Sequence, residues 1–272
     1  MEEKIKKNEK TVEQIIDDMN LFDDDLMSVV FDKNKEATEL LLKIILKRND
    51  IKVIEVVGQR EFKNSIIGGR NIRLDILAED NKGKNYNIEV QRQAAGAHIR
   101  RARFHSSMLD SRMLKAKKEF SELQDSYIVF ITEKDIFGYG LPIYTVNRYF
   151  EETDQIFDDG SHIVYVNGSY KGDDAIGRLI HDFGCKKSKD IFYSELAKGV
   201  KHFKEEGGRK IMCEAVEKYA EQRAEQRAEV VRMDNLLDSI KKLMINLKIG
   251  EEQAMELLEI SEQDKEVLLK RL

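Results

Sequence analysis

Alternation of apolar and polar residues in the first third of the chain predicts two β-strands joined by a tight turn. Residues 72–79 place apolar side chains at every second position, and residues 86–91 repeat the pattern. Successive side chains of a strand leave opposite faces of a sheet, so this period of two indicates that one face lies in a core. Residues 80–84 read Asp-Asn-Lys-Gly-Lys and supply the turn, with Gly83 available for positive φ.

The polar face of this predicted hairpin holds the candidate metal-binding residues. If Ile88 and Val90 point into the core, Glu89 and Gln91 share the opposite face, and Asp75 on the first strand lies across from them. Two carboxylates and an amide that converge on one sheet face are typical of a metal site. An ordinary polar sheet face is the simpler alternative, and it would leave the two acids without a cation.

Strands and helices then alternate along the chain, which predicts an α/β fold. Apolar runs rich in β-branched and aromatic residues predict strands at 51–57, 127–132, 143–146 and 162–167. Periodic apolar stripes predict helices at 34–48, 94–119, 173–183, 191–204 and from about 209 to 248, with a short helix at the end. We divide the chain into a lead-in (1–23), a core (24–188) and a helical extension (189–272).

The long helix of the extension carries a seam with a period of seven. Val230 and Leu237 occupy one heptad position, and Met233 and Ile240 occupy another. Such a seam forms either a coiled coil or a helix packed back on its neighbour. We interpret the extension as an interaction element that makes a homo-oligomer; DNA reading by a helix-turn-helix is the weaker alternative because no basic recognition helix is present.

Glu39 lies on the apolar side of the predicted helix 34–48, together with Leu42 and Leu46. Glu36 instead shares its side with lysines and is expected in solvent. A carboxylate that points toward packed residues costs free energy unless it is paired or bound to a metal. Glu39 is therefore either a further ligand near the metal or one half of a buried salt bridge.

Charge is distributed unevenly along the 272 residues, whose net charge is −5. Residues 13–25 hold six acids and no base, which favours a solvated acidic lead-in over a metal role for Asp23, Asp24 or Asp25. The predicted helix after Gln91 is strongly basic, and we expect Arg100 and Arg103 to contact the phosphates of DNA.

Other residue types narrow the class of protein. The two cysteines, Cys185 and Cys213, form no disulfide framework or zinc motif and are expected to be idle thiols. The histidines are scattered singly and have no metal-binding spacing. The first residues are too polar for a signal peptide and no apolar run reaches the length of a membrane span, so we expect a cytoplasmic protein without a membrane partner.

An ordered set of short motifs between Asp24 and Lys204 resembles a known family. An Asp followed, after a hairpin, by Glu-x-Lys is the signature of the PD-(D/E)XK nuclease superfamily, and here Asp75, Glu89 and Gln91 stand at those positions. The chain further resembles the recombination-promoting nuclease, or nuclease-family transposase, branch through RARFHSS (101–107), LPIY (141–144), IVYVNG (163–168) and LIHDF (179–183).

This resemblance implies a restriction-endonuclease-like mixed sheet flanked by helices, and a metal-dependent DNA endonuclease. Asp75, Glu89 and the Val90 carbonyl would bind Mg²⁺ or Mn²⁺, and Gln91 would complete the catalytic set. The resemblance also implies a glutamate on the first core helix near the metal, for which Glu39 is the candidate. The alternative is a non-catalytic nuclease-fold scaffold that binds DNA or protein through its coiled-coil tail, because Gln91 replaces the usual lysine.

Overall fold

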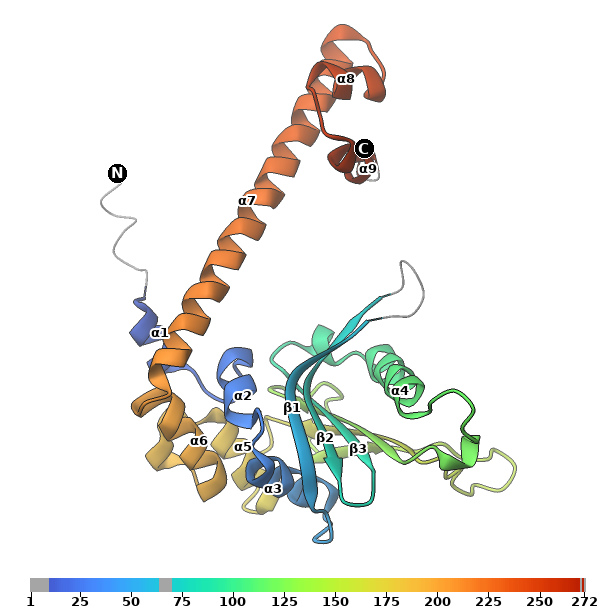
Figure 1. The fold of residues 1–272 in the computed structure, drawn as a ribbon, viewed down its shortest axis with the longest axis vertical. Helices are drawn as coiled ribbons and strands as arrows, with labels where there is room; N and C mark the ends of the chain where they lie inside the picture. The colour runs from blue at the N-terminus through green and yellow to red at the C-terminus, as the bar shows by residue number, and fades with distance from the viewer. Residues whose placement is uncertain (1–9, 64–69, 270, 272) are drawn as a thin grey trace. The chain divides into compact units, whose positions relative to one another are not determined.

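A mixed six-stranded sheet forms the centre of the fold (Figure 1). The structure is a computed structural model that describes residues 10–63, 70–269 and 271. The strands lie in the order β1-β2-β3-β4-β6-β5: β1 Val53–Phe62, β2 Ile72–Asp80, β3 Asn85–Gln91, β4 Ser126–Thr132, β6 Ser161–Asn167 and β5 Ile143–Val146. Strands β1 to β3 pair antiparallel, β3, β4 and β6 pair parallel, and β5 is an antiparallel edge strand. The predicted α/β class with a mixed sheet is confirmed.

Helices cover both faces of this sheet. Figure 1 shows α4 on one side and α2, α3, α5 and α6 on the other. Their bounds, with those of the remaining helices, are α1 Val12–Asp18, α2 Asp24–Phe31, α3 Lys35–Leu46, α4 Ile99–Met113, α5 Ala175–Gly184, α6 Ser194–Glu205, α7 Arg209–Leu247, α8 Glu251–Leu257 and α9 Glu262–Leu269, and single 3₁₀ turns occur at Ala94–Ala97, Phe120–Glu122 and Ser188–Asp190. Strand β4 is buried along its whole length, as a strand covered on both faces should be.

Two elements have bounds that differ from the predicted ones. Strand β1 runs on to Phe62, beyond the predicted end at 57, because its ladder with β2 continues to the pair Phe62↔Ile72. The predicted helix 94–119 is shorter at both ends. The His98 side chain accepts a hydrogen bond from Arg100 N and caps α4 at its start, and Lys117 beyond its end has a left-handed φ of 71°.

The acidic lead-in is part of the core, which corrects its interpretation as a solvated segment. Ile16 and Leu21 have no exposed surface, and Leu21 N donates to the Phe183 carbonyl at 3.0 Å. Phe22 packs edge-to-face on Phe183, with ring centroids 5.5 Å apart. The apolar residues between the acids therefore determine where this segment lies. Burying their side chains stabilises the packed position, while the charged side chains beside them stay in contact with solvent.

The chain divides into two units, Met1–Cys213 and Glu214–Leu272, so the boundary differs from the predicted one at residue 188. Helix α6 belongs to the first unit because the buried Lys204 ammonium donates to the carbonyls of Asp17, Met19 and Lys186. In the second unit, Met233 and Ile240 of α7 pack with residues of α8 and α9. These seam residues thus follow the second alternative, a helix packed back on its neighbours. Among the described residues, no helix has the length and apolarity to cross a membrane.

Candidate active site

Asp75 and Glu89 meet where the hairpin opens. The ladder between β2 and β3 ends at the pair Ile76↔Ile88, which leaves the next backbone groups free to bond side chains. Val90 N donates to Asp75 Oδ2 at 3.1 Å, and Asp75 N lies 3.4 Å from Glu89 Oε1. Both carboxylates are buried, with 5% and 0% of their surface exposed. The structure therefore brings together the two acids that the sequence singled out.

Glu89 is held by cationic and polar groups from α4. Arg101 Nη2 lies 2.7 Å from Glu89 Oε2, and His105 Nδ1 lies 3.5 Å from Oε1. Arg101 also donates to the Gly96 carbonyl at 3.1 Å, and His105 contacts the Asn87 amide at 3.2 Å. The buried charge of Glu89 is thus balanced inside the protein, whereas within the described part of the chain Asp75 forms no ion pair with a cationic side chain.

Gln91 completes the cluster from the end of β3. Its Nε2 donates to Asp75 Oδ2 at 3.4 Å, and its amide rests against the backbone of Gly96. A Cβ on Gly96 would lie only 1.9 Å from Gln91 Oε1, so only glycine allows the amide this position. Asp75 therefore lies within hydrogen-bonding reach of the other two signature residues, Glu89 and Gln91.

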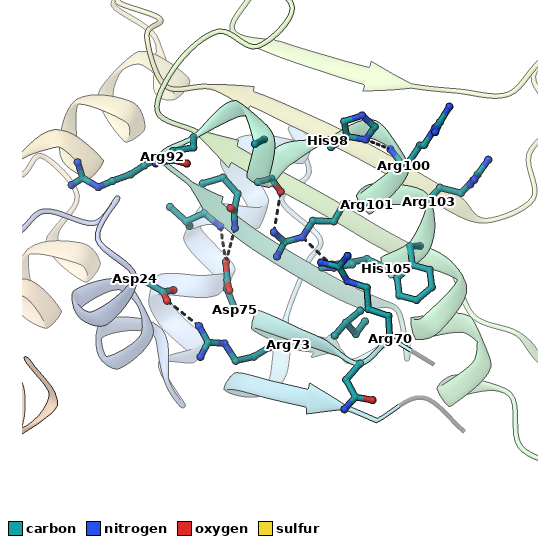
Figure 2. A pocket seen from close by; sticks show the side chains of 18 of the residues that line it. Asp24, Arg70, Arg73, Asp75, Arg92, His98, Arg100, Arg101, Arg103 and His105 are labelled. Carbon is teal, nitrogen blue, oxygen red and sulfur yellow. Dashed lines mark hydrogen bonds and ion pairs between the residues drawn. The ribbon is translucent and has the colours of Figure 1, made fainter. Parts of the chain in front are cut away.

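A cavity of about 1040 Å³ opens over Asp75 and is lined by arginines (Figure 2). The lining arginines come from β2, from the start of α4 and from the segments beside them: Arg70, Arg73, Arg92, Arg100, Arg101 and Arg103. Arg73 pairs with Asp24 at 3.0 Å and Arg92 with Asp23 at 2.8 Å. Arg100 and Arg103 are exposed and, within the described part of the chain, form no ion pair, so both are available to a polyanion.

The environment of Asp75 opposes its negative charge. Burial raises the pKa of Asp75, and the nearby charges of Glu89 and Asp24 raise it further, to about 8. The hydrogen bond from Val90 N and the charge of Arg101 act in the opposite direction and are outweighed. An acid whose pKa is displaced this far, at the floor of a cavity, is a typical feature of functional sites.

The sequence interpretation assigned two residues of this site no place in it. Asp24 lines the cavity although it lies about 50 positions before Asp75, and only the packed path of the lead-in brings it there. Arg101 contacts Glu89, whereas the sequence pointed to its neighbours Arg100 and Arg103. Its spacing of four from the buried His105 is the signal that places Arg101 on the inner side of α4.

The structure places the candidate Glu39 away from Asp75 and its cavity. Its carboxylate accepts hydrogen bonds from Lys43 Nζ at 2.6 Å and from Val53 N at 2.9 Å, at the start of β1. The register pairs Val53 with Asp80, at the opposite end of β2 from Ile72 and Asp75. The contacts of Glu39 thus agree with the salt-bridge alternative, and it does not line the cavity over Asp75.

The donor atoms at the cavity floor suit a hard divalent ion. Oδ2 of Asp75 accepts from Val90 N and Gln91 Nε2, but Oδ1 has no hydrogen-bond partner among the described residues. Val90 lines the same cavity, and Glu89 lies directly beside it. Carboxylate and carbonyl oxygens are the ligands that Mg²⁺ and Mn²⁺ prefer. A cation here would also relieve the repulsion that raises the pKa of Asp75.

Comparison with known families agrees with this geometry. A family model described as "PD-(D/E)XK nuclease family transposase" matches residues 29–167, slightly more than half of the 272 residues. Searches of curated proteins and of solved structures returned no match. The matched segment contains every strand of the sheet, the signature residues Asp75, Glu89 and Gln91, and the arginine-lined start of α4. The chain therefore belongs to the PD-(D/E)XK nuclease family transposases.

Proposed function

We propose that this protein is a metal-dependent DNA endonuclease that hydrolyses phosphodiester bonds in recombination or in the movement of a genetic element. The observation that carries the proposal is a pair of adjacent buried carboxylates: Asp75 lines a cavity rimmed with exposed arginines, and Glu89 lies directly beside Asp75. A polyanionic substrate is drawn to the rim, and the acids below it offer oxygen ligands to a divalent ion.

The residues at and beside Asp75 have distinct proposed roles. Asp75, Glu89 and the Val90 carbonyl would hold Mg²⁺ or Mn²⁺, which when bound polarises the scissile phosphate and lowers the pKa of a coordinated water. Gln91 orients water or phosphate by hydrogen bonds, since an amide cannot supply the charge of a lysine. Arg101 holds Glu89 in place, and proton transfer from the attacking water falls to solvent.

A non-catalytic scaffold that binds DNA or protein is the alternative. It is favoured by the ion pair between Arg101 and Glu89, which already neutralises one of the two acids, and by Gln91 in place of lysine. Incubation of the purified chain with plasmid DNA, with Mg²⁺ and with EDTA, separates the two functions. Nicked or linear product only with Mg²⁺ supports the endonuclease. DNA binding with no cleavage, and no divalent-ion binding by calorimetry, supports the scaffold.

We expect DNA affinity to depend on Arg100 and Arg103. Replacing both with alanine removes up to two phosphate contacts, so the slope of log affinity against log salt should shallow by about 0.9 per lost contact with duplex. The loss should be similar for DNA of any sequence, because phosphate contacts carry no sequence information. Fluorescence anisotropy over a series of salt concentrations measures both effects.

Arg178→Ala is the matched control for this double variant. Arg178 is an exposed arginine of α5 that pairs with the exposed Asp173 and does not line the cavity. Its removal changes the net charge by one without touching the rim, and we expect little change in affinity. An unchanged affinity and salt slope in a folded Arg100→Ala, Arg103→Ala protein would contradict the phosphate-binding role of the rim.

We further propose that the C-terminal unit assembles the protein into a homo-oligomer. Met233 and Ile240 are buried within that unit, but Val230 and Val231 on α7 remain more than half exposed. Apolar side chains left exposed on a helix favour contact with a second copy. Removing residues 214–272 is therefore expected to leave a folded first unit with fewer subunits. Light scattering that finds the same subunit number before and after truncation would contradict this role.

A further inference from the structure

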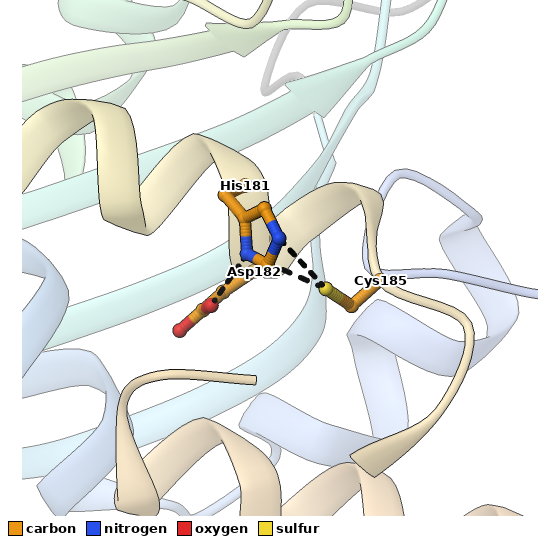
Figure 3. A group of neighbouring side chains, drawn as sticks. All are labelled: His181, Asp182 and Cys185. Carbon is orange, nitrogen blue, oxygen red and sulfur yellow. Dashed lines mark hydrogen bonds and ion pairs between the residues drawn. The ribbon is translucent and has the colours of Figure 1, made fainter. Parts of the chain in front are cut away.

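Three side chains with metal-binding atoms gather at the end of α5, outside the cavity described above (Figure 3). His181, Asp182 and Cys185 each offer one ligand atom, and these atoms lie within 4.8 Å of one another. His181 Nδ1 lies 3.5 Å from Cys185 Sγ and 3.3 Å from Asp182 Oδ1. None of these three residues lines the arginine-rimmed cavity, so the cluster needs an explanation of its own.

The separations agree with those between ligands on one zinc ion. Zinc binds sulfur at about 2.3 Å and nitrogen or carboxylate oxygen at about 2.0–2.2 Å, in a tetrahedral arrangement. Two ligands of a tetrahedron at these bond lengths lie about 3.3–3.6 Å apart. The distances from His181 Nδ1 to the thiol sulfur and to the carboxylate oxygen, 3.5 Å and 3.3 Å, fall in this range, and all three ligand atoms lie within 4.8 Å of one another.

The cluster is held in place by its surroundings. Asp182 is fully buried, and its two carboxylate oxygens accept hydrogen bonds from Phe192 N and Tyr193 N at 2.8 Å each. The His181 ring rests against Phe192, with centroids 4.7 Å apart, while half of the side chain stays exposed. Hydrogen bonds that orient a ligand strengthen metal sites, and the exposed ring gives an ion access from solvent.

We propose that His181, Asp182 and Cys185 form a second metal site that binds a thiophilic transition-metal ion, with Zn²⁺ the expected one. A thiolate and an imidazole select Zn²⁺ over the hard ions Mg²⁺ and Mn²⁺, so this site is distinct in chemistry from the one at Asp75. Three protein ligands leave one position for water. The bound ion would hold together the last turn of α5 and Cys185, the residue that follows it.

Co²⁺ is a suitable probe, because a thiolate ligand gives it an intense near-ultraviolet charge-transfer band. The full chain, free of any affinity tag, is titrated with Co²⁺ and then with Zn²⁺. We expect one equivalent of Co²⁺ to produce the band and Zn²⁺ to remove it. Cys185→Ser should abolish the band, whereas Cys213→Ser, which removes the other cysteine, should keep it. Asp75→Asn should also keep it, because the two sites are independent.

Two results would overturn the proposal: no band in the wild-type chain, or a band that survives Cys185→Ser. If Cys185→Ser fails to fold by circular dichroism, His181→Ala decides, because its half-exposed ring leaves no large cavity in the core. We expect His181→Ala to weaken Zn²⁺ binding at least about tenfold by competition with a chromophoric chelator. Unchanged affinity in that variant would reduce the cluster to a hydrogen bond between an imidazole and a thiol.

Discussion

Replacing Asp75 with asparagine is expected to lower Mg²⁺-dependent cleavage of plasmid DNA by roughly 1000-fold or more. Asn keeps the shape of the side chain and an oxygen to accept from Val90 N, but it removes the negative charge that a divalent ion requires. A metal ion stabilises a phosphoryl transition state by several kcal/mol, and each 1.36 kcal/mol is a factor of about ten in rate. Rates of nicking measured at saturating DNA give the comparison.

Gln91 provides a graded comparison at the same site. Gln91→Ala should reduce the rate less than Asp75→Asn, because a neutral hydrogen bond contributes less than a metal ligand. Gln91→Lys places the more usual superfamily residue at this position and should keep some activity. Asp173→Asn is the control for the loss of one acid, since Asp173 is almost fully exposed and lies away from the cavity.

Cleavage that survives in a folded Asp75→Asn protein would place the chemistry elsewhere in the chain or in a contaminating nuclease. Glu89 is a less informative target than Asp75. Its loss would leave the half-buried Arg101 without its partner, and removing one side of a buried ion pair destabilises a protein. A defect in folding and a defect in catalysis would then be difficult to separate.

The sequence predicts the parts of this site that depend on local pattern. The alternation around the hairpin is enough to place Asp75 and Glu89 on adjacent strands, because strand register follows from the turn and from the buried face. The continuous apolar run at 127–132 predicts a strand covered on both faces, and the structure confirms that β4 is buried along its length. A local pattern is enough in these cases because the positions of Asp75 and Glu89 depend on residues of the same hairpin.

Positions that depend on packing between distant segments are not predicted in the same way. Asp24 reaches the cavity only because Leu21 and Phe22 anchor the lead-in against α5, a contact across roughly 160 residues of sequence. Glu39 shows the opposite case: its apolar helix face is predicted correctly, but that face turns the carboxylate toward the start of β1 and away from Asp75. Knowing the face of a helix does not reveal which part of the sheet it covers.

The second large effect concerns stability in the absence of metal. Because the pKa of Asp75 is about 8 in the folded protein and 3.8 in its ordinary state, the folded chain binds one more proton than the unfolded chain between these values. The free energy of unfolding contributed by this group is therefore greatest below about pH 4, falls as the pH rises toward 8, and levels off above it.

Asp75→Asn removes this dependence, so the variant should be more stable than the wild type in EDTA, with an advantage that grows by up to about 1 kcal/mol per pH unit between pH 5 and 8. Urea unfolding of both proteins across this range measures the difference, and Asp173→Asn should show no such trend.

Addition of Mg²⁺ should stabilise the wild type more at pH 8 than at pH 6, because the ion competes with the proton for the Asp75 carboxylate. It should leave the stability of Asp75→Asn unchanged. A constant difference between wild type and Asp75→Asn at every pH would show that Asp75 is ionised without strain, and a Mg²⁺ effect shared by both proteins would place the ion away from Asp75.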